Sequence, residues 1–80
     1  MKKMDIKIYT TPTCHYCDLA KRFFMSKGLE YTAIDLVQHP ERGQEMINLS
    51  GQMGVPVILI NNKVIIGFNK EKIEEVLGSL

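Results

Sequence analysis

The chain has 80 residues, a formal net charge of +1, 45% hydrophobic residues and 24% charged residues. These proportions are ordinary for a globular protein, and the length suits a single domain over residues 1–80. Basic and acidic residues are mixed along the chain, so the sequence lacks a basic stripe for neutralising phosphates, and we expect no nucleic-acid partner.

The amino-terminal sequence MKKMDIKIYT has two lysines but no apolar core behind them. A secretory signal peptide needs such a core of about 7–15 residues. No apolar run approaches the roughly 20 residues that span a bilayer. We therefore expect a cytoplasmic protein with no membrane partner. In that compartment, two cysteines are more often catalytic or metal-binding than a structural disulfide.

The first half of the chain reads as strand, helix, strand. Apolar and polar residues alternate in 5–10, which predicts a strand. Apolar residues then recur at helical spacing, which predicts a helix over 15–27 with Gly28 as its stop. Alternation returns in 30–36 and predicts a second strand.

A second helix is expected to begin at His39-Pro40-Glu41. Proline suits the first helical position, and a carboxylate beside it complements the positive end of the helix dipole. This helix should end at Gly51. The residues of the helix that are expected to be buried are Met46, Ile47 and Leu49.

The remaining elements are a hairpin and a last helix. Residues 55–60 form the most apolar run, and Asn61-Asn62 joins them to 63–66, a pattern typical of a hairpin. Residues 69–80 predict a helix with Asn69 as its N-cap. The expected inward face of this helix consists of Ile73, Val76, Leu77 and Leu80.

This order of elements, strand–helix–strand–helix–hairpin–helix, predicts the fold class. A strand–helix–strand unit gives a parallel pair of strands, and a hairpin adds an antiparallel pair. We expect an α/β fold in which helices flank one mixed sheet of four strands.

The cysteines, Cys14 and Cys17, form a C-x-x-C motif at the junction of the first strand and helix, which is typical of a redox pair. Residues spaced in this way share one helix face and lie within reach of a disulfide. At a helix start, unpaired N–H groups and the dipole stabilise a thiolate, which is the form that attacks disulfides. We expect Cys14 to be the nucleophile and Cys17 to resolve the mixed disulfide.

Two segments, TTPTCHYCDLAKRFF and GVPVILINNKVIIGF, resemble glutaredoxin-like proteins of the thioredoxin-fold superfamily. The resemblance implies a thioredoxin-like βαβαββα fold and an electron-carrying thiol–disulfide oxidoreductase that acts on protein or glutathione mixed disulfides. It also implies no bound cofactor, a monomer, a cis Val55-Pro56 bond, and pairing of the Val55 backbone with substrate. The other expected substrate-binding residues are Thr13, His15, Tyr16, Gly54, Pro56, Gly67 and Phe68.

The chain departs from the pattern of glutathione-using glutaredoxins at several positions. It has His15 for the proline of C-P-Y-C, Thr10 and Thr11 for an expected lysine, Gly54 for a threonine, and Ile66-Gly67 for a glycine pair. The acidic group for the glutathione amino end is absent or displaced, with Glu71 the nearest candidate.

The segment GFNKEKI resembles the ending of NrdH-type redoxins, although their usual lysine and cysteine spacers are missing. Those proteins accept electrons from thioredoxin reductase, which uses NADPH, and pass them to ribonucleotide reductase. The resemblance therefore leaves two reductants open, glutathione and thioredoxin reductase. Ribonucleotide reductase is a candidate partner.

Other interpretations of the cysteine pair remain. A zinc site needs about four ligands, and the only other soft donors are His15 and His39, so we expect no metal site in a monomer. An iron–sulfur cluster shared between two chains is an alternative. Family members with proline after the first cysteine tend to avoid the cluster, and this chain has His15 at that position. A further alternative is a non-catalytic module that binds peptides beside Val55-Pro56.

Residues near the pair have their own interpretations. His15 either stabilises the Cys14 thiolate as an imidazolium or is an exposed spacer. Tyr16 is expected to pack against substrate, and Thr13 to cap the first helix.

The phenylalanines have structural interpretations as well. Phe23 and Phe24 are expected in the core rather than in contact with a ligand. Phe68 either forms an exposed apolar patch beside the site or packs on the last helix.

Overall fold

The computed structural model describes residues 5–79. Its strands are β1 (Ile6–Thr10), β2 (Thr32–Asp35), β3 (Val57–Ile60) and β4 (Lys63–Ile66). Its helices are α1 (His15–Ser26), the short 3₁₀ helix η1 (Pro40–Arg42), α2 (Gly43–Ser50) and α3 (Lys70–Gly78). The order of elements expected from the sequence is confirmed.

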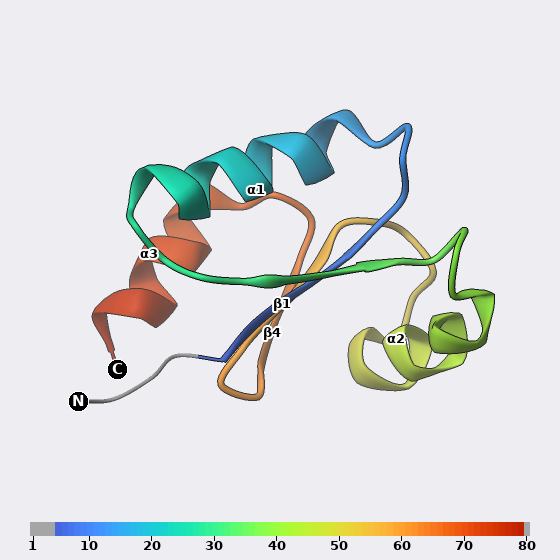
Figure 1. Cartoon of the computed structure of the whole chain (residues 1–80). Coiled ribbons are helices and arrows are strands. Elements are labelled where there is room, and N and C mark those ends of the chain that lie inside the picture. The colour runs from blue at the N-terminus through green and yellow to red at the C-terminus, as the bar shows by residue number, and fades with distance from the viewer. Residues whose placement is uncertain (1–4, 80) are drawn as a thin grey trace.

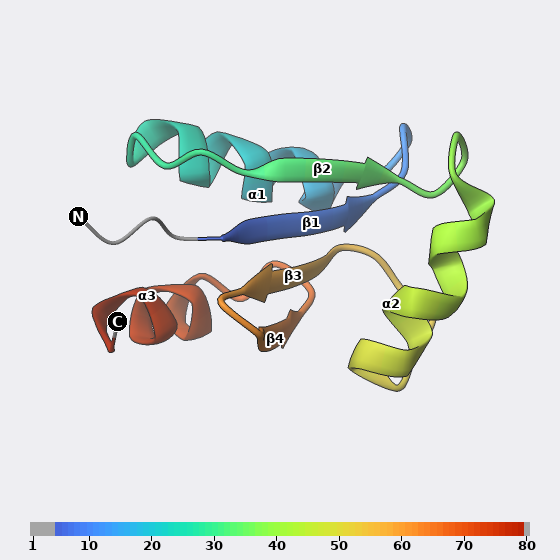
Figure 2. The ribbon, with the colours of Figure 1, turned by 60° about the horizontal axis from the view of Figure 1, so that its bottom comes forward.

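The four strands form one mixed sheet in the order β2-β1-β3-β4 (Figure 2). Strand β1 runs parallel to β2 and antiparallel to β3, and β3 runs antiparallel to β4. Tyr9 in β1 pairs with Val57 in β3. The loop that leaves β1 therefore starts beside the residues that enter β3.

Helices α1 and α3 cover one face of the sheet and α2 covers the other (Figure 1). This division follows from the alternation of side chains along a strand. The first face buries Ile6, Ile8, Ala20, Phe24, Ile58, Ile60, Ile65, Ile73 and Val76. The second buries Tyr9, Ile34, Met46 and Val57. Each large apolar side chain buried in this way contributes about 1.5–3 kcal/mol.

The hairpin turn is confirmed at Asn61 and Asn62, which have φ angles of 46° and 72°. Two successive positive φ angles suit the twist of a tight hairpin, and asparagine tolerates them. The Asn61 side chain also accepts the N–H of Asp5 at 2.8 Å, while Asn61 N donates to Asp5 O at 2.9 Å. These bonds hold the turn against the start of β1.

Caps at two helix ends agree with the sequence. The stop at Gly28, with φ 69°, is confirmed, although α1 ends at Ser26 and Lys27 is its C-cap. The Asn69 side chain accepts the N–H of Lys72 at 3.1 Å and caps α3, as expected. In α3, Ile73 and Val76 are buried and Leu77 is partly buried, whereas Leu80 lies outside the described residues.

The second helix differs from the expectation. Pro40 begins a 3₁₀ turn, and the α-helix starts only at Gly43. Met46 is buried and Ile47 is half-buried, but the prediction for Leu49 was wrong because it is 41% exposed. With eight residues, α2 has about two turns. It meets the sheet through Met46, and in its last turn Asn48 and Leu49 are exposed while Ser50 is half-buried.

Three strands are shorter than expected. Strand β1 begins at Ile6 rather than at residue 5, and β2 spans Thr32–Asp35 rather than 30–36. Strand β3 begins at Val57 rather than at residue 55. Pro56 has no N–H to donate to the ladder, which explains the later start of β3.

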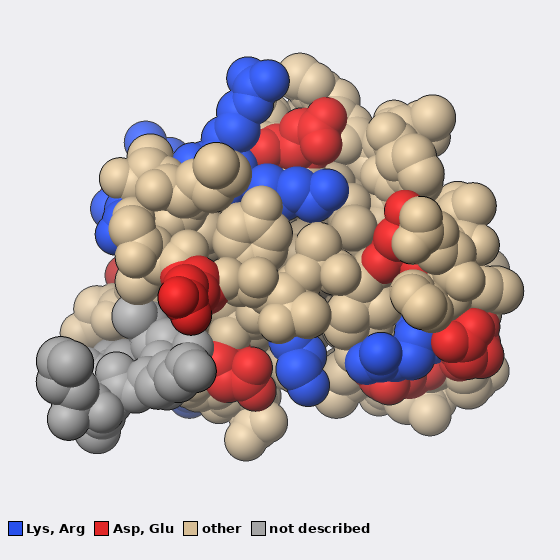
Figure 3. Space-filling model, in the orientation of Figure 1, with Lys and Arg blue, Asp and Glu red and all other residues tan. Residues whose placement is uncertain are grey.

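Acidic and basic side chains are interspersed on the face of the molecule drawn in Figure 3. This distribution agrees with the mixed charge pattern of the sequence. Within residues 5–79, no helix combines the length and the apolar character needed to cross a membrane.

Candidate active site

The two cysteines lie together at the start of α1. Cys14 is the N-cap residue, with extended backbone angles, and Cys17 lies in the first turn. Their Cα atoms are 5.2 Å apart, and their sulfur atoms are joined in a disulfide. The Cys14 Sγ accepts the main-chain N–H of Cys17 at 3.1 Å. The prediction that Thr13 caps α1 was wrong, because the backbone stays extended through Cys14 and the sulfur itself is the acceptor.

The two sulfurs have different surroundings. Cys17 has 0% exposure, whereas Cys14 is half-buried. A reagent from solvent therefore reaches Cys14 first. The N–H group directed at Cys14 Sγ, together with the helix dipole, stabilises negative charge on that sulfur.

Main-chain bonds fix the loop that carries Cys14. Its N–H donates to Thr11 O at 3.3 Å, and its carbonyl accepts the N–H of Asp18 at 3.3 Å. Thr10, the last residue of β1, is buried, and its carbonyl accepts the N–H of Leu36 at 2.9 Å. Cys14 thus lies on a short connection whose two ends are held by main-chain bonds.

The segment before β3 lies beside this connection. The Val55-Pro56 bond is cis, as the resemblance implied. Since Tyr9 pairs with Val57, Pro56 lies next to the end of β1. Gly67, at the end of β4, donates its N–H to Pro56 O at 2.8 Å and has φ 78°, a conformation that glycine adopts readily. Three expected site segments, the Cys14 loop, Val55-Pro56 and Gly67, therefore lie together at one end of the sheet.

The side chains expected to flank the cysteines are largely in solvent. Thr13, His15 and Gly54 are exposed, Tyr16 is 60% exposed, and Val55 is half-buried. The rings of His15 and Tyr16 contact each other edge to face, with centroids 5.7 Å apart. Their roles toward a substrate stay predictions.

Phe68 is half-buried and packs edge to face on Phe23 of α1, with ring centroids 6.0 Å apart. It also packs against the core beneath α1 and α3. Phe68 is therefore packed rather than fully exposed, but its ring partner lies in α1 and not in the last helix, where the second interpretation places it. Phe24 has 0% exposure and Phe23 is half-buried against the same core, so the expected core positions of these residues are confirmed.

The structure shows a contact that sequence reasoning missed, in the loop between α2 and Val55. The Gln52 side chain binds both main-chain groups of Gly54. Its Oε1 accepts the Gly54 N–H at 2.6 Å, and its Nε2 donates to Gly54 O at 3.0 Å. A glutamine two residues before a glycine is too common a pattern to have indicated this contact.

A second missed cluster joins α2 to β1. The Tyr9 hydroxyl donates to Glu45, whose carboxylate also accepts two 2.8 Å bonds from the Arg42 guanidinium. The bonds from Arg42, and then that from Tyr9, lower the pKa of Glu45 to about 2. Burial, followed by the bond to Glu45, raises the pKa of Tyr9 to about 12. The cluster fixes the helix that leads into the Gln52 loop.

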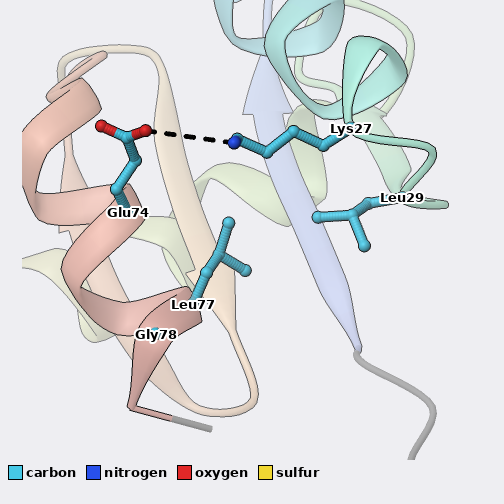
Figure 4. Close-up of a pocket in the computed structure, with 5 residues that line it drawn as sticks. All are labelled: Lys27, Leu29, Glu74, Leu77 and Gly78. Atoms are coloured by element: carbon cyan, nitrogen blue, oxygen red, sulfur yellow. Dashed lines mark ion pairs between the residues drawn. The ribbon is translucent and has the colours of Figure 1, made fainter.

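A cavity of about 530 Å³ lies elsewhere, between the ends of α1 and α3 (Figure 4). Lys27 and Glu74 form an ion pair of 3.9 Å at its rim. Lys27 caps the end of α1 opposite the cysteines, so this cavity is separate from the redox pair. Within residues 5–79, no group of three or more histidine, cysteine or acidic side chains is placed to hold a metal ion.

Comparison with known proteins places this geometry in a family. The family model for glutaredoxin matches residues 6–65. An uncharacterised glutaredoxin-like 8.6 kDa protein in the rubredoxin operon of Clostridium pasteurianum is 40% identical over 72 residues, which cover 90% of this chain and 96% of that protein. Glutaredoxin 3 of Escherichia coli K12 is 37% identical over 57 residues, covering 71% of this chain and 69% of that protein.

Solved structures agree. The glutaredoxin-like protein NrdH-redoxin from Escherichia coli superposes with a TM-score of 0.78 at 26% identity, covering 90% of this chain and 93% of that one. The expected thioredoxin-like fold is confirmed. The chain belongs to the glutaredoxin family, and its Cys14–Cys17 pair supports the thiol–disulfide oxidoreductase chemistry of that family.

Proposed function

We propose that this protein reduces disulfides of protein substrates with a dithiol mechanism, in which Cys14 attacks and Cys17 resolves. The observation that carries the proposal is the asymmetry of the pair. Cys17 is fully buried and donates its N–H to the sulfur of Cys14, which is the more accessible of the two.

The exchange proceeds in two balanced steps. The Cys14 thiolate attacks one sulfur of the substrate disulfide, and the other substrate sulfur leaves as a thiolate. The Cys17 thiolate, having lost its proton to solvent, then attacks Cys14 Sγ and displaces the second substrate thiolate. Two electrons have passed to the substrate, and the protein is left with the Cys14–Cys17 disulfide. A two-electron reductant must then restore the dithiol.

Two reductants fit this scheme, glutathione and thioredoxin reductase with NADPH. The similarity to NrdH-redoxin over 93% of that chain supports the second. Asn69 also supports thioredoxin reductase. It stands near the position where glutathione-using relatives are expected to have an acidic group, and its side-chain oxygen caps α3. Glutathione is supported by Glu71, in the first turn of α3, which is the nearest acidic group for the glutathione amino end.

The test measures reduction of insulin disulfides by the wild type and by Cys14→Ser, with each reductant system in turn. We expect turnover with thioredoxin reductase and NADPH, and no turnover by Cys14→Ser.

Rapid turnover with glutathione alone would assign that reductant instead. Full activity of Cys14→Ser would overturn the mechanism, and a visible absorption band on a purified dimer would favour the iron–sulfur alternative.

A substrate with a biological role can be tested in the same assay. Ribonucleotide reductase in its oxidised form is the candidate suggested by the resemblance to NrdH-type redoxins. Retained affinity of Cys14→Ser for a peptide, without any reductase activity of the wild type, would instead favour the binding-module alternative.

A further inference from the structure

The loop between α2 and β3 is held by one side chain, that of Gln52. The carboxamide oxygen accepts the N–H of Gly54 at 2.6 Å, and the carboxamide nitrogen donates to the carbonyl of the same residue at 3.0 Å. One side chain therefore occupies both main-chain groups of Gly54. We call this pair of bonds the Gln52 clamp.

The clamp is anchored to the end of α2 through Ser50. The Ser50 Oγ lies 3.3 Å from Gln52 N and 3.4 Å from Gln52 Nε2, and it accepts both. Its own proton is donated to carbonyl oxygens within reach, Met46 O at 2.7 Å or Gln52 O at 2.9 Å. The clamp thus rests on a helix that is itself bonded to β1 through the cluster of Tyr9 and Glu45.

Gly54 has the shape that the clamp requires. A Cβ atom added to this residue would lie 2.8 Å from Gln52 Oε1, closer than real contacts allow. Any larger residue would push the carboxamide away from the main chain. A larger residue at position 54 therefore requires the Gln52 carboxamide to move, which couples Gly54 to Gln52.

The clamp sets the direction of the next peptide group. The carbonyl of Gly54 and the N–H of Val55 belong to one planar unit and point in opposite directions. A bond from Gln52 to that carbonyl therefore turns the Val55 N–H to the other side. At this end of the sheet, Gly67 N donates to Pro56 O. Among residues 5–79, no main-chain bond is found to the N–H of Val55.

We infer that Gln52 is a positioning residue that orients the Val55 N–H toward an extended main-chain segment of the substrate. The inference rests on the proposed reductase function and adds the residue that controls main-chain recognition. It separates two classes of disulfide. A cystine peptide benefits from the clamp because it has a main chain to pair, whereas a small disulfide without peptide bonds does not.

The experiment mixes the reduced protein, in a single turnover, with a disulfide-linked peptide or with cystamine. We expect Gln52→Ala to lower the second-order rate constant for the peptide about tenfold, as befits a lost hydrogen bond and a displaced contact. The constant for cystamine should change less than about twofold, since cystamine has no main chain to orient. The matched control is Gln44→Ala, whose carboxamide bonds only Asn48 on the exposed face of α2, and both constants should stay at the wild-type value.

Two more variants keep the test sharp. Gly54→Ala should lower the peptide constant as much as Gln52→Ala, and the double variant should be no slower than either one. Gln52→Glu keeps the side-chain length but, when ionised, cannot donate to Gly54 O. It should therefore lower the rate constant for the peptide and leave that for cystamine unchanged. Circular dichroism on heating verifies that each variant is folded.

The outcomes separate the inference from the proposed function. Equal losses with both disulfides, no loss with either, or multiplying effects of Gln52→Ala and Gly54→Ala would overturn the role of the clamp. A wild-type protein that reduces neither disulfide would overturn the reductase proposal instead.

Discussion

The sulfur of Cys14 has two functions in the folded chain. It caps α1 by accepting the Cys17 N–H, and in the proposed mechanism it attacks the substrate. Caps are ordinarily oxygen-bearing side chains such as serine or asparagine. Here the hydrogen bond that completes the helix also stabilises the thiolate, so the local structure and the chemistry have one physical cause.

His15 is the residue between the cysteines whose effect is most open to measurement. It is exposed, and its ring contacts Tyr16. If its imidazolium stabilises the Cys14 thiolate, His15→Pro should make the reduction potential more negative by about 10–20 mV, equivalent to about 0.5–1 kcal/mol for two electrons. Equilibration with a glutathione buffer measures the potential, and alkylation of Cys14 should shift to higher pH. Unchanged values would identify His15 as a spacer.

At the scale of elements, α3 depends on its Asn69 cap. Asn69→Ala removes the acceptor of the Lys72 N–H and should cost about 1 kcal/mol. For a domain of this size we expect a melting temperature lower by about 4–8 °C. Thermal unfolding measures this change, with Asn48→Ala on the exposed face of α2 as the control. A loss as large in the control would contradict a specific capping effect.

The cluster of Tyr9, Arg42 and Glu45 predicts how stability depends on pH. Because the folded-state pKa of Glu45 is lowered from 4.5 to about 2, its contribution is complete above about pH 4.5 and disappears as the pH falls toward 2. Glu45→Gln should cost about 1 kcal/mol at pH 7, a value reduced for the partial exposure of the carboxylate.

Urea unfolding of the wild type and of Glu45→Gln, at pH 7 and at about pH 2.5, tests this dependence. The difference in unfolding free energy between the two proteins should shrink at the lower pH. The same difference at both pH values would show that the ionised carboxylate does not stabilise the fold.

The helices and strands differ in how much of each could be predicted from the sequence. Periodicity, the Asn61-Asn62 turn and the Asn69 cap were enough to predict the order of strands and helices, because each depends on neighbouring residues. Leu49 was misplaced because apolar spacing does not specify which side of α2 faces the sheet; Met46 is the α2 residue buried there and Leu49 is exposed. The Gln52 clamp was missed because it depends on the path of a loop, which no local preference specifies.

For the whole molecule, the fold separates the redox pair from the cavity between α1 and α3. The cysteines lie at one end of α1 and the cavity at the other, and α1 spans about 18 Å at 1.5 Å per residue. The radius of gyration is 11.8 Å, as expected of a compact chain of this length. The site is thus formed at one end of the sheet, where β1 and β4 end and β3 begins.

This separation predicts that the rim of the cavity does not affect disulfide reduction. Lys27→Ala removes the exposed ion pair with Glu74 and the contact of its ammonium with the Phe23 ring, 5.1 Å from the centroid. We expect a loss of stability below about 1 kcal/mol. Insulin reduction should proceed at the wild-type rate, and a severalfold loss of that rate would contradict the separation of the two regions.

The most direct test of the proposed mechanism traps the mixed disulfide. Reduced Cys17→Ser is mixed with a disulfide-linked peptide, and the intact protein and its digest are analysed by mass spectrometry. We predict that one peptide is attached at Cys14 and persists, because the resolving thiol is absent. Attachment at Cys17 in the matched Cys14→Ser variant, with none at Cys14 in Cys17→Ser, would contradict the assigned roles.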